Sequence, residues 1–243
     1  MKYIIKFLTA IYELLIALPL FVCTTTFCAV FTIVFIHWSD SCWVHAVQVW
    51  WSRSFCRLFL CKVTVDGKEN IDPHQSCVFV SNHQSLADVF VIYGWLPVIF
   101  KWIMKKELRR IPLVGLACEA AGHIFLDRKS RASAVKSIQK AEKTLQNGVS
   151  VVIFPEGTRS GTGEVGKFKR GAFQIAFDLG LPIVPLSLSG CMEVQKKGDT
   201  LVNLFRHVHL HIDKPIETKE QEQDQIIELA RNRVIEGMIT IHN

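Results

Sequence analysis

Several common sequence signatures are missing from this chain of 243 residues, and each absence removes a class of protein. The cysteines include no C-x-x-C pair, so neither a thioredoxin-like redox motif nor a paired-cysteine zinc site is expected. A G-x-S-x-G nucleophile elbow is also absent, which argues against a serine hydrolase built on that turn. The sequence has no internal repeat and no low-complexity segment. It therefore favours one ordinary domain with a small appendage and reduced thiols.

Charge is missing from one long stretch near the start of the chain. No charged residue occurs from Leu14 to Ile36, about 23 positions, and a helix of that length is about 34 Å long, enough to cross a bilayer. The run is too long for a signal-peptide core and leads into aromatic residues rather than a cleavage site. The next segment, Trp43–Leu60, mixes aromatic residues with arginine, which is typical of a helix at the headgroup level. We therefore predict an N-terminal membrane anchor of two helices in residues 1–60.

Basic residues flank both sides of the uncharged run. Lys2 and Lys6 precede it, whereas Arg53, Arg57 and Lys62 follow it. A single membrane span would place positive charge on both sides, against the positive-inside rule. We therefore expect a hairpin that enters the membrane and returns through the second helix, so that the rest of the chain faces the cytoplasm. The alternative is a pair of buried core helices.

The net charge of +6 fits either a nucleic-acid ligand or anionic lipids and phosphorylated substrates. No nucleic-acid motif is present, and many basic residues cluster after the expected anchor, so we expect a lipid bilayer as partner and no nucleic acid. The clustered residues are Lys101, Lys105, Lys106, Arg109, Arg110, Arg128, Lys129 and Arg131.

The residue pattern changes after Leu60, where short runs of β-branched residues begin to alternate with stretches of mixed charge. We place a domain boundary there and predict that residues 61–243 form an α/β domain with a largely parallel central sheet flanked by helices. Strands are expected at Val63–Val65, Cys77–Val80, Ile99–Trp102, Ile124–Leu126, Val149–Phe154, Ile183–Leu188 and His207–Ile212. Helices are expected near Ser85–Tyr93, Ser130–Leu145, Gly171–Leu179 and Lys219–Ile239.

A histidine and an aspartate follow the expected strand Cys77–Val80 directly. His83 lies in a turn, and Asp88 stands five residues later at the start of a helix. This spacing lets the carboxylate bond one imidazole nitrogen and leaves the other free as a general base. The alternative is an ordinary loop histidine and an exposed helix residue. Ser85, which lies between them, is predicted to be a helix N-cap rather than a nucleophile.

Two further strand ends deliver arginine. Arg128 follows Ile124–Leu126, and Arg159 follows Val149–Phe154. Because guanidinium groups bind phosphate well and the carboxyl ends of parallel strands share one edge, we predict a pocket that joins the base to an anion clamp. Glu156 would repel a phosphate, so its expected task is to hold Arg159 or a glycerol hydroxyl.

Four ordered segments resemble the conserved blocks of the glycerolipid acyltransferase family, and most closely its 1-acylglycerol-3-phosphate acyltransferases. The order and spacing of the blocks, over roughly residues 82–190, make the resemblance far more specific than any one block. The expected N-terminal helices and the chain length also fit. The segments are Asn82-His83 to Asp88, Phe125 to Arg128, Phe154 to Ser160 and Leu181-Pro182-Ile183-Val184-Pro185.

The resemblance implies that His83 takes the proton from the free hydroxyl of 1-acylglycerol-3-phosphate as this attacks an acyl thioester, with Asp88 holding the imidazole. The donor is acyl-CoA or an acyl-carrier-protein thioester, the product is phosphatidic acid for phospholipid biosynthesis, and neither a cofactor nor a metal is implied. Another lysolipid acceptor, lipid hydrolysis and non-catalytic lipid binding are the alternatives. By the same resemblance the glycerol-phosphate end is bound by Arg128, Glu156, Gly157 and Arg159, with Lys167 or Lys169 on phosphate and Pro182 or Pro185 at the acyl donor or pocket wall.

Three histidines alternate along the expected strand His207–Ile212 and so share one of its faces. They are not accompanied by cysteine or carboxylate at zinc spacing, so we predict a polar strand face rather than a metal site. The G-x-G-x-x-G string at residues 161–166 is read as a loop, because it lies beyond the strand end that a dinucleotide fingerprint requires.

Overall fold

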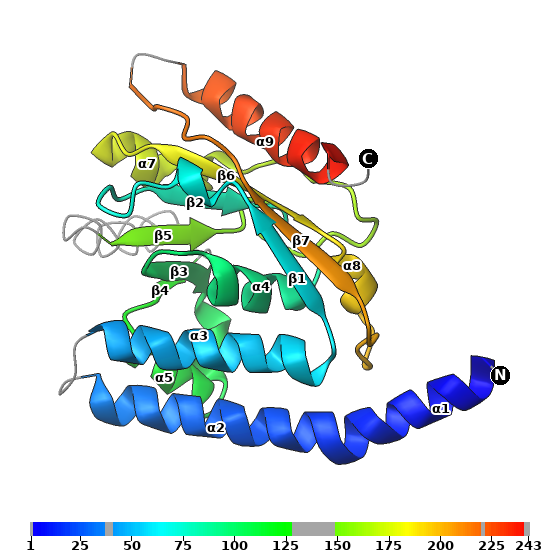
Figure 1. Ribbon diagram of the computed structural model, residues 1–243. Coiled ribbons are helices and arrows are strands. Elements are labelled where there is room, and N and C mark those ends of the chain that lie inside the picture. The colour runs from blue at the N-terminus through cyan, green and yellow to red at the C-terminus, as the bar shows by residue number, and fades with distance from the viewer. Residues whose placement is uncertain (1, 37–40, 128–148, 220–221, 241–243) are drawn as a thin grey trace.

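The computed structural model describes residues 2–36, 41–127, 149–219 and 222–240 (Figure 1). The predicted helix Ser130–Leu145 lies outside these ranges, as do Arg128, Lys129 and Arg131. The helical elements are α1 (Lys2–Tyr12), η1 (Glu13–Ala17), α2 (Leu18–Phe35), α3 (Ser41–Leu58), η2 (Lys68–Asn70), α4 (Ala87–Trp95), η3 (Lys106–Arg110), α5 (Val114–Ala120), η4 (Arg170–Ala172), α7 (Gln174–Leu179), α8 (Cys191–Val194) and α9 (Gln223–Thr240). The strands are β1 (Lys62–Asp66), β2 (Val78–Ser81), β3 (Phe100–Lys105), β4 (Ile124–Leu126), β5 (Ser150–Ile153), β6 (Ile183–Ser189) and β7 (His207–Ile212).

The strands form one sheet in the order β1-β7-β6-β2-β5-β3-β4. Neighbours run parallel except β6 and β7, which run antiparallel, so the prediction of a largely parallel sheet flanked by helices is confirmed. Since β1 is parallel to β7, both of these strands begin on the side where the other five end. The central strands β2, β5 and β6 are mostly apolar and buried throughout because helices cover both of their faces.

Alternate side chains of the central strand enter two separate cores. Phe79 packs on the side of α3 and α4, whereas Val78 and Val80 pack on the side of α7 and α9. Figure 1 shows the resulting layers, with α9 on one face of the sheet and α3 and then α2 on the other. The central strand is therefore held from both faces, and the loop that follows it starts from a rigid position.

The N-terminal elements α1, η1 and α2 form one continuous helix, of which Phe7–Phe35 is long and apolar enough to cross a membrane. Only 17% of its most apolar window is buried, unlike the core helix of a globular domain. Within the described ranges it is the one helix that meets this test. α3 packs along α2 and also against α4, so it joins the apolar helix to the domain that carries the sheet.

The seven predicted strands are all present, with bounds that differ from the structure by at most three residues. Two differences concern helices. α4 begins at Ala87, so Leu86 and not Ser85 is its N-cap, although the Ser85 hydroxyl accepts the Ala87 N–H at 3.1 Å. η2, η3, α5 and α8 were not predicted. The domain division near residue 60, which falls between α3 and β1, stays a prediction.

Candidate active site

His83 and Asp88 meet at the carboxyl end of the central strand. His83 Nδ1 lies 2.8 Å from Asp88 Oδ2, and the Asp88 side chain is fully buried. The same oxygen accepts the backbone N–H groups of Gln84 at 2.7 Å and Ser85 at 2.8 Å. Because three donors converge on Oδ2, the carboxylate is fixed and the Nδ1 atom of His83 must carry a proton. The spacing of five residues thus produces the predicted contact.

The other ring nitrogen of His83, Nε2, has no hydrogen-bond partner among the described residues. The imidazole stacks on Phe154 with ring centroids 3.9 Å apart and planes 10° apart, while 16% of the side chain stays exposed. Stacking holds the plane of the ring, and the exposed fraction leaves it open to a substrate. Nε2 therefore has both the lone pair and the access that a general base needs.

The loop after β5 is tied to the backbone of His83 on both sides. Glu156 Oε1 accepts the His83 N–H at 2.9 Å, and Ser160 N–H donates to the His83 carbonyl at 2.7 Å. Glu156 Oε2 accepts the Gly166 N–H at 3.0 Å. Burial raises the pKa of the Glu156 carboxyl, although the two amides partly oppose this. The position of the catalytic loop is thus set by a second carboxylate.

This contact pattern gives Glu156 a task other than the predicted bond to Arg159, while its predicted contact with a glycerol hydroxyl stays a prediction. In the part of the chain that the structure describes, its carboxylate binds two backbone amides and not the guanidinium of Arg159. Gly157, directly after it, has a φ of 76°, a conformation that favours glycine and turns the chain back towards His83. The sequence pattern did not reveal this turn, which directs the carboxylate of Glu156 inward.

Asn82 joins the catalytic loop to the next strand of the sheet. Its side chain donates from Nδ2 to the Leu188 carbonyl and accepts the Leu188 N–H on Oδ1, both at 2.9 Å. Asn82 is fully buried, so these two bonds replace the ladder that β2 and β6 would continue here. Asn82 is therefore a positioning residue, with His83 directly beside it.

The predicted cations are distributed over three places. Arg159 is part-exposed and precedes Ser160, so it lies in the loop bonded to His83. Lys167 and Lys169 are exposed and line a separate cavity of about 620 Å³ against α9. Arg128 lies outside the described residues. The structure thus places Arg159 in the loop whose backbone bonds His83, places the two lysines on a different cavity, and leaves every phosphate contact a prediction.

More basic side chains gather where β3 and β4 end. Lys106 and Arg110, with the paired Arg109, line a second cavity of about 320 Å³. Lys106 Nζ lies 2.9 Å from Asp127 Oδ2, and Arg109 forms two bonds to Glu119 at 2.9 and 2.6 Å. The carboxyl ends of β3 and β4 face the same side of the sheet as His83, and Glu107, Glu119 and Asp127 balance the charge of these three basic side chains.

Pro182 and Pro185 are both buried in the sheet. The Pro182 carbonyl accepts the Val78 N–H at 3.0 Å, and Pro185 pairs with Val80 in the register. Pro182 therefore lies beside the start of β2, and Pro185 lies nearer its catalytic end. Their role at an acyl donor or pocket wall stays a prediction.

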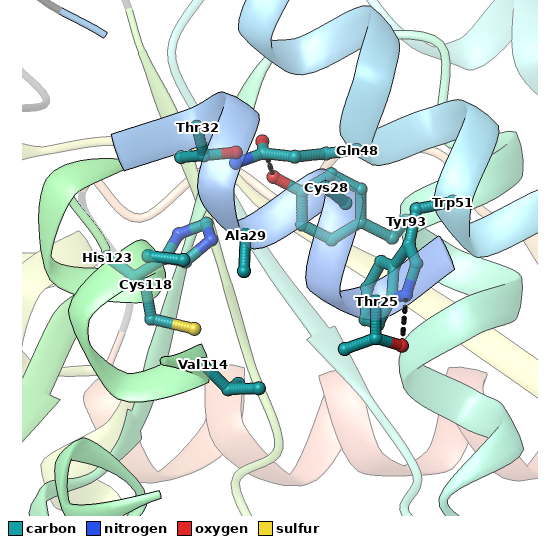
Figure 2. A pocket seen from close by; sticks show the side chains of 11 residues that line it. Thr25, Cys28, Ala29, Thr32, Gln48, Trp51, Tyr93, Val114, Cys118 and His123 are labelled. Carbon is teal, nitrogen blue, oxygen red and sulfur yellow. Dashed lines mark hydrogen bonds between the residues drawn. The ribbon is translucent and has the colours of Figure 1, made fainter. Parts of the chain in front are cut away.

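A row of aromatic rings leads from the dyad to a small cavity under α2. Phe154 stacks on Trp102 at 5.4 Å, and Trp102 faces Tyr93 at 6.3 Å. Tyr93 lines the cavity together with side chains of α2, α3 and α5, and its hydroxyl donates to Gln48 (Figure 2). The volume of about 60 Å³ equals about two water molecules, so the cavity in this form is too small for a fatty acyl chain.

The histidines of β7 bind neighbouring side chains of β1. Thr64 Oγ1 lies 3.0 Å from His207 Nε2 and 3.1 Å from His209 Nδ1, and the Asp66 carboxylate contacts both His209 and His211. Burial alone would raise the pKa of Asp66, but the hydrogen bonds with the two imidazoles outweigh it and lower the pKa. The described residues contain no group of three or more side chains arranged to hold a metal ion.

The parallel sheet, the buried carboxylate and the histidine with one free nitrogen are features of an α/β enzyme with a candidate base. A comparison with protein families agrees, since the family described as Acyltransferase matches residues 62–189, more than half of the chain. The chain therefore belongs to this acyltransferase family.

Comparisons with individual proteins show a more specific similarity within this family. The chloroplastic 1-acyl-sn-glycerol-3-phosphate acyltransferase BAT2 of Brassica napus is 34% identical over 79% of this chain and 54% of its own length. The alpha 1-acyl-sn-glycerol-3-phosphate acyltransferase of Ovis aries is 36% identical over 76% of this chain and 64% of its own length. The crystal structure of the 1-acyl-sn-glycerophosphate acyltransferase PlsC of Thermotoga maritima is 28% identical with a TM-score of 0.77, covering 97% of both chains. The chain thus spans roughly half to two thirds of the curated relatives it matches.

Proposed function

We propose that this chain transfers a fatty acyl group from an acyl thioester to the free hydroxyl of 1-acylglycerol-3-phosphate, giving phosphatidic acid for phospholipid biosynthesis. The observation that carries the proposal is the His83–Asp88 pair, in which Nδ1 is held at 2.8 Å from a buried carboxylate while Nε2 stays accessible. The names of the relatives support the acceptor. The thioester is carried by CoA or by acyl-carrier protein.

The reaction needs one base and no covalent enzyme intermediate. His83 Nε2 removes the proton of the acceptor hydroxyl as the hydroxyl oxygen bonds to the thioester carbonyl carbon. The carbon–sulfur bond then breaks, and the leaving thiolate takes the proton back from the imidazolium. Asp88 holds the tautomer and stabilises the positive charge that the ring carries between these two steps.

An anionic acceptor suits the charge around the dyad. Arg159 lies in the loop bonded to His83, and the ends of β3 and β4, where Arg110 is exposed, face the same side of the sheet. We assign the glycerol-phosphate end to Arg159 together with Arg128, which stands two residues after β4 in the sequence. Lys167 and Lys169 are kept as further phosphate contacts, and neither a cofactor nor a metal is required.

The enzyme is proposed to work at a membrane, with its catalytic domain on the cytoplasmic side. The exposed apolar surface of Phe7–Phe35 supports the membrane contact. α3 returns along α2, where Trp51 Nε1 donates to Thr25 Oγ1 at 2.9 Å, and this supports a two-helix hairpin rather than a single span. Reporters attached at Lys2 and at Arg53 should both face the cytoplasm, and reporters on opposite sides would refute the hairpin.

The test of the function is acyl transfer by purified, detergent-solubilised protein with a labelled acyl thioester. Lysophosphatidic acid, lysophospholipids with larger headgroups and water are offered together. Labelled phosphatidic acid from the wild type, but not from His83→Ala, is the expected result. Label that moves only to another lysolipid or to water would overturn the proposed acceptor and leave the fold and family unchanged.

A further inference from the structure

Three large apolar side chains are exposed where β1 and β7 begin. Phe205 is 73% exposed, Leu201 is 53% exposed and Leu60 is 41% exposed. Leu60 and Phe205 also have φ angles of 54° and 58°, in the left-handed region that residues other than glycine seldom adopt. Backbone strain of this kind persists only where the surroundings impose it, and here it holds two side chains outward without burying them.

These residues lie on the catalytic side of the sheet. β7 runs antiparallel to β6, so the start of β7 is on the side where β2 delivers His83, and the start of β1 lies beside it through the bond from Lys62 N–H to the Arg206 carbonyl at 2.9 Å. In Figure 1 the orange loop before β7 descends from the sheet towards α1. We call this surface the Phe205 patch and define it as Arg57, Leu60, Lys62, Leu201, Phe205 and Arg206.

The two segments that carry the patch are each joined to the apolar N-terminal helix by a hydrogen bond. Glu13 is buried and accepts the Val202 N–H at 3.1 Å, and the Tyr12 hydroxyl donates to the Leu58 carbonyl at 2.8 Å. Glu13 begins the π-helical turn η1, a rare distortion that is frequent at functional positions. The next residues, Leu14 and Leu15, are 65% and 67% exposed. The apolar surface of the helix therefore continues towards the loop that carries Phe205.

The charges around the apolar side chains are mainly positive. Arg57, Lys62 and Arg206 are exposed within the patch, and Lys196 and Lys197 are exposed in the same loop as Phe205. The exposed acidic residues of that loop region are Glu193 and Asp199. Aromatic and aliphatic side chains rimmed by lysine and arginine fit the headgroup layer of a bilayer that contains anionic lipid.

The same loop reaches the candidate active site. Lys197 Nζ donates to the Arg159 carbonyl at 3.1 Å, so a single segment contacts the membrane helix at Val202 and the substrate loop at Arg159. If this segment becomes ordered at a lipid surface, it would hold His83 and Asp88 at a fixed position relative to that surface.

We propose that the Phe205 patch inserts into the headgroup layer of an anionic bilayer and forms the place where a lysolipid leaves the membrane for the active site. The occupant is the lipid surface, and the inference rests on the proposed acyl transfer to a membrane lysolipid. The patch adds a second membrane contact to that of the apolar helix, and it acts on the uptake of acceptor rather than on the chemical step.

The kinetic test uses the double variant Leu201→Ser with Phe205→Ser in the full chain, reconstituted into vesicles of equal parts phosphatidylcholine and phosphatidylglycerol. Its matched control is Leu229→Ser with Ile239→Ser, which removes exposed apolar side chains from α9 on the other face of the sheet. Transfer to long-chain lysophosphatidic acid in the vesicles should fall about tenfold in kcat/KM, while transfer to a short-chain, water-soluble lysophosphatidic acid should stay within about twofold. The control should stay within about twofold for both acceptors.

Three results would overturn the membrane role of the patch. An equal loss for both acceptors would indicate a folding or catalytic role. An unchanged rate with vesicles would show that the patch makes no lipid contact that the reaction needs. A changed oligomeric state of the double variant in detergent, with vesicle activity retained, would make the patch a protein interface instead.

A second measurement needs no enzyme activity. With p-benzoylphenylalanine in place of Phe205, illumination in the same vesicles should cross-link labelled phosphatidylglycerol, and the same group in place of Leu229 should not. No cross-link at position 205 would overturn the inference. A cross-link at 205 in a protein that transfers acyl groups to neither acceptor would keep the lipid contact and overturn the proposed function.

Discussion

Two clusters in this molecule pair histidine with aspartate, and they differ in how the carboxylate is held. Asp88 is fully buried, and its Oδ2 atom accepts two backbone N–H groups besides the ring of His83. Asp66 is half exposed and is shared by His209 and His211 on the neighbouring strand. One carboxylate is therefore fixed by the backbone, and the other is held by two side chains.

The difference shows what makes a histidine useful as a base. His83 has one nitrogen committed to a rigid acceptor and the other free, whereas His209 bonds through both ring nitrogens, to Thr64 and to Asp66. A ring with both nitrogens occupied has no lone pair to offer a substrate. Residue type and pairing alone do not define the site, since both clusters have them. The clusters differ in rigidity, since the carboxylate of Asp88 is buried and held by the backbone, whereas that of Asp66 is half exposed and held by side chains.

Replacing His83 should give the largest effect. His83→Ala should lower kcat by about 10²–10⁴-fold because the general base is lost, with little change in the thermal unfolding midpoint. His211→Ala is the matched control, since it also removes an imidazole bonded to a carboxylate, and it should keep kcat within about threefold. Initial rates of acyl transfer measure both. If the two variants lose activity equally, the contrast between the clusters is wrong.

Asp88→Asn should be the next largest change. The amide keeps the shape of the side chain but cannot accept three donors on one charged oxygen, so kcat should fall by about 10²–10⁴-fold and the free energy of unfolding by about 1–3 kcal/mol. Asp66→Asn should leave kcat within about threefold. Rates and thermal unfolding of both variants, measured in the same detergent, test the comparison. Full activity of Asp88→Asn would show that orientation by the carboxylate is unnecessary.

Glu156→Gln should have an intermediate effect. One amide oxygen can satisfy either the His83 or the Gly166 N–H, and the amide nitrogen then faces the other donor, which costs about 1–3 kcal/mol. Since the His83 backbone moves with this contact, we expect kcat to fall about 10–100-fold. Glu164→Gln, an exposed change in the same loop, should have no effect on either quantity. A raised KM with unchanged kcat would instead indicate that Glu156 binds the substrate.

The smallest expected effect concerns the stability that Asp66 contributes and how this stability depends on pH. The folded pKa of Asp66 lies below its usual value of 3.8, so its contacts stabilise the fold above that pH and the contribution is lost as pH falls through the folded pKa. Asp66→Asn should therefore lower the free energy of unfolding by less than about 1 kcal/mol at pH 7, and the difference from wild type should shrink towards pH 3. Thermal unfolding at both pH values measures this, and a growing difference at low pH would reverse the sign.

Much of the fold could be predicted because its strands are short apolar runs with clear ends. Ile124–Leu126 and His207–Ile212 were predicted with the observed bounds. α5 could not be predicted, because it follows Leu113 at a φ of 62° with no side-chain cap to mark its start. Its position depends on packing against α2, a contact between distant parts of the sequence.

The contacts of the candidate site also fall into those that the sequence could predict and those that it could not. The contact between His83 and Asp88 is local, so the spacing made it possible and the family resemblance supported it. The bonds from Glu156 to His83 and from Asn82 to Leu188 join residues 73 and 106 positions apart, which no local pattern shows. The outward position of Phe205 was also hidden, because exposure of one aromatic residue depends on the turn before β7.

The pairing of β1 with β7 has a consequence for how the protein is made. Thr64 and its partner His207 are 143 positions apart, and a ribosome adding about 5–20 residues per second needs roughly 7–30 s to cover that distance. The apolar helix emerges before any of these strands, and β2 also waits for β5 and β6. During this interval the helix has no completed domain to pack against. The nascent chain should therefore reach a bilayer first and complete its catalytic domain afterwards, already tethered to the surface on which it works.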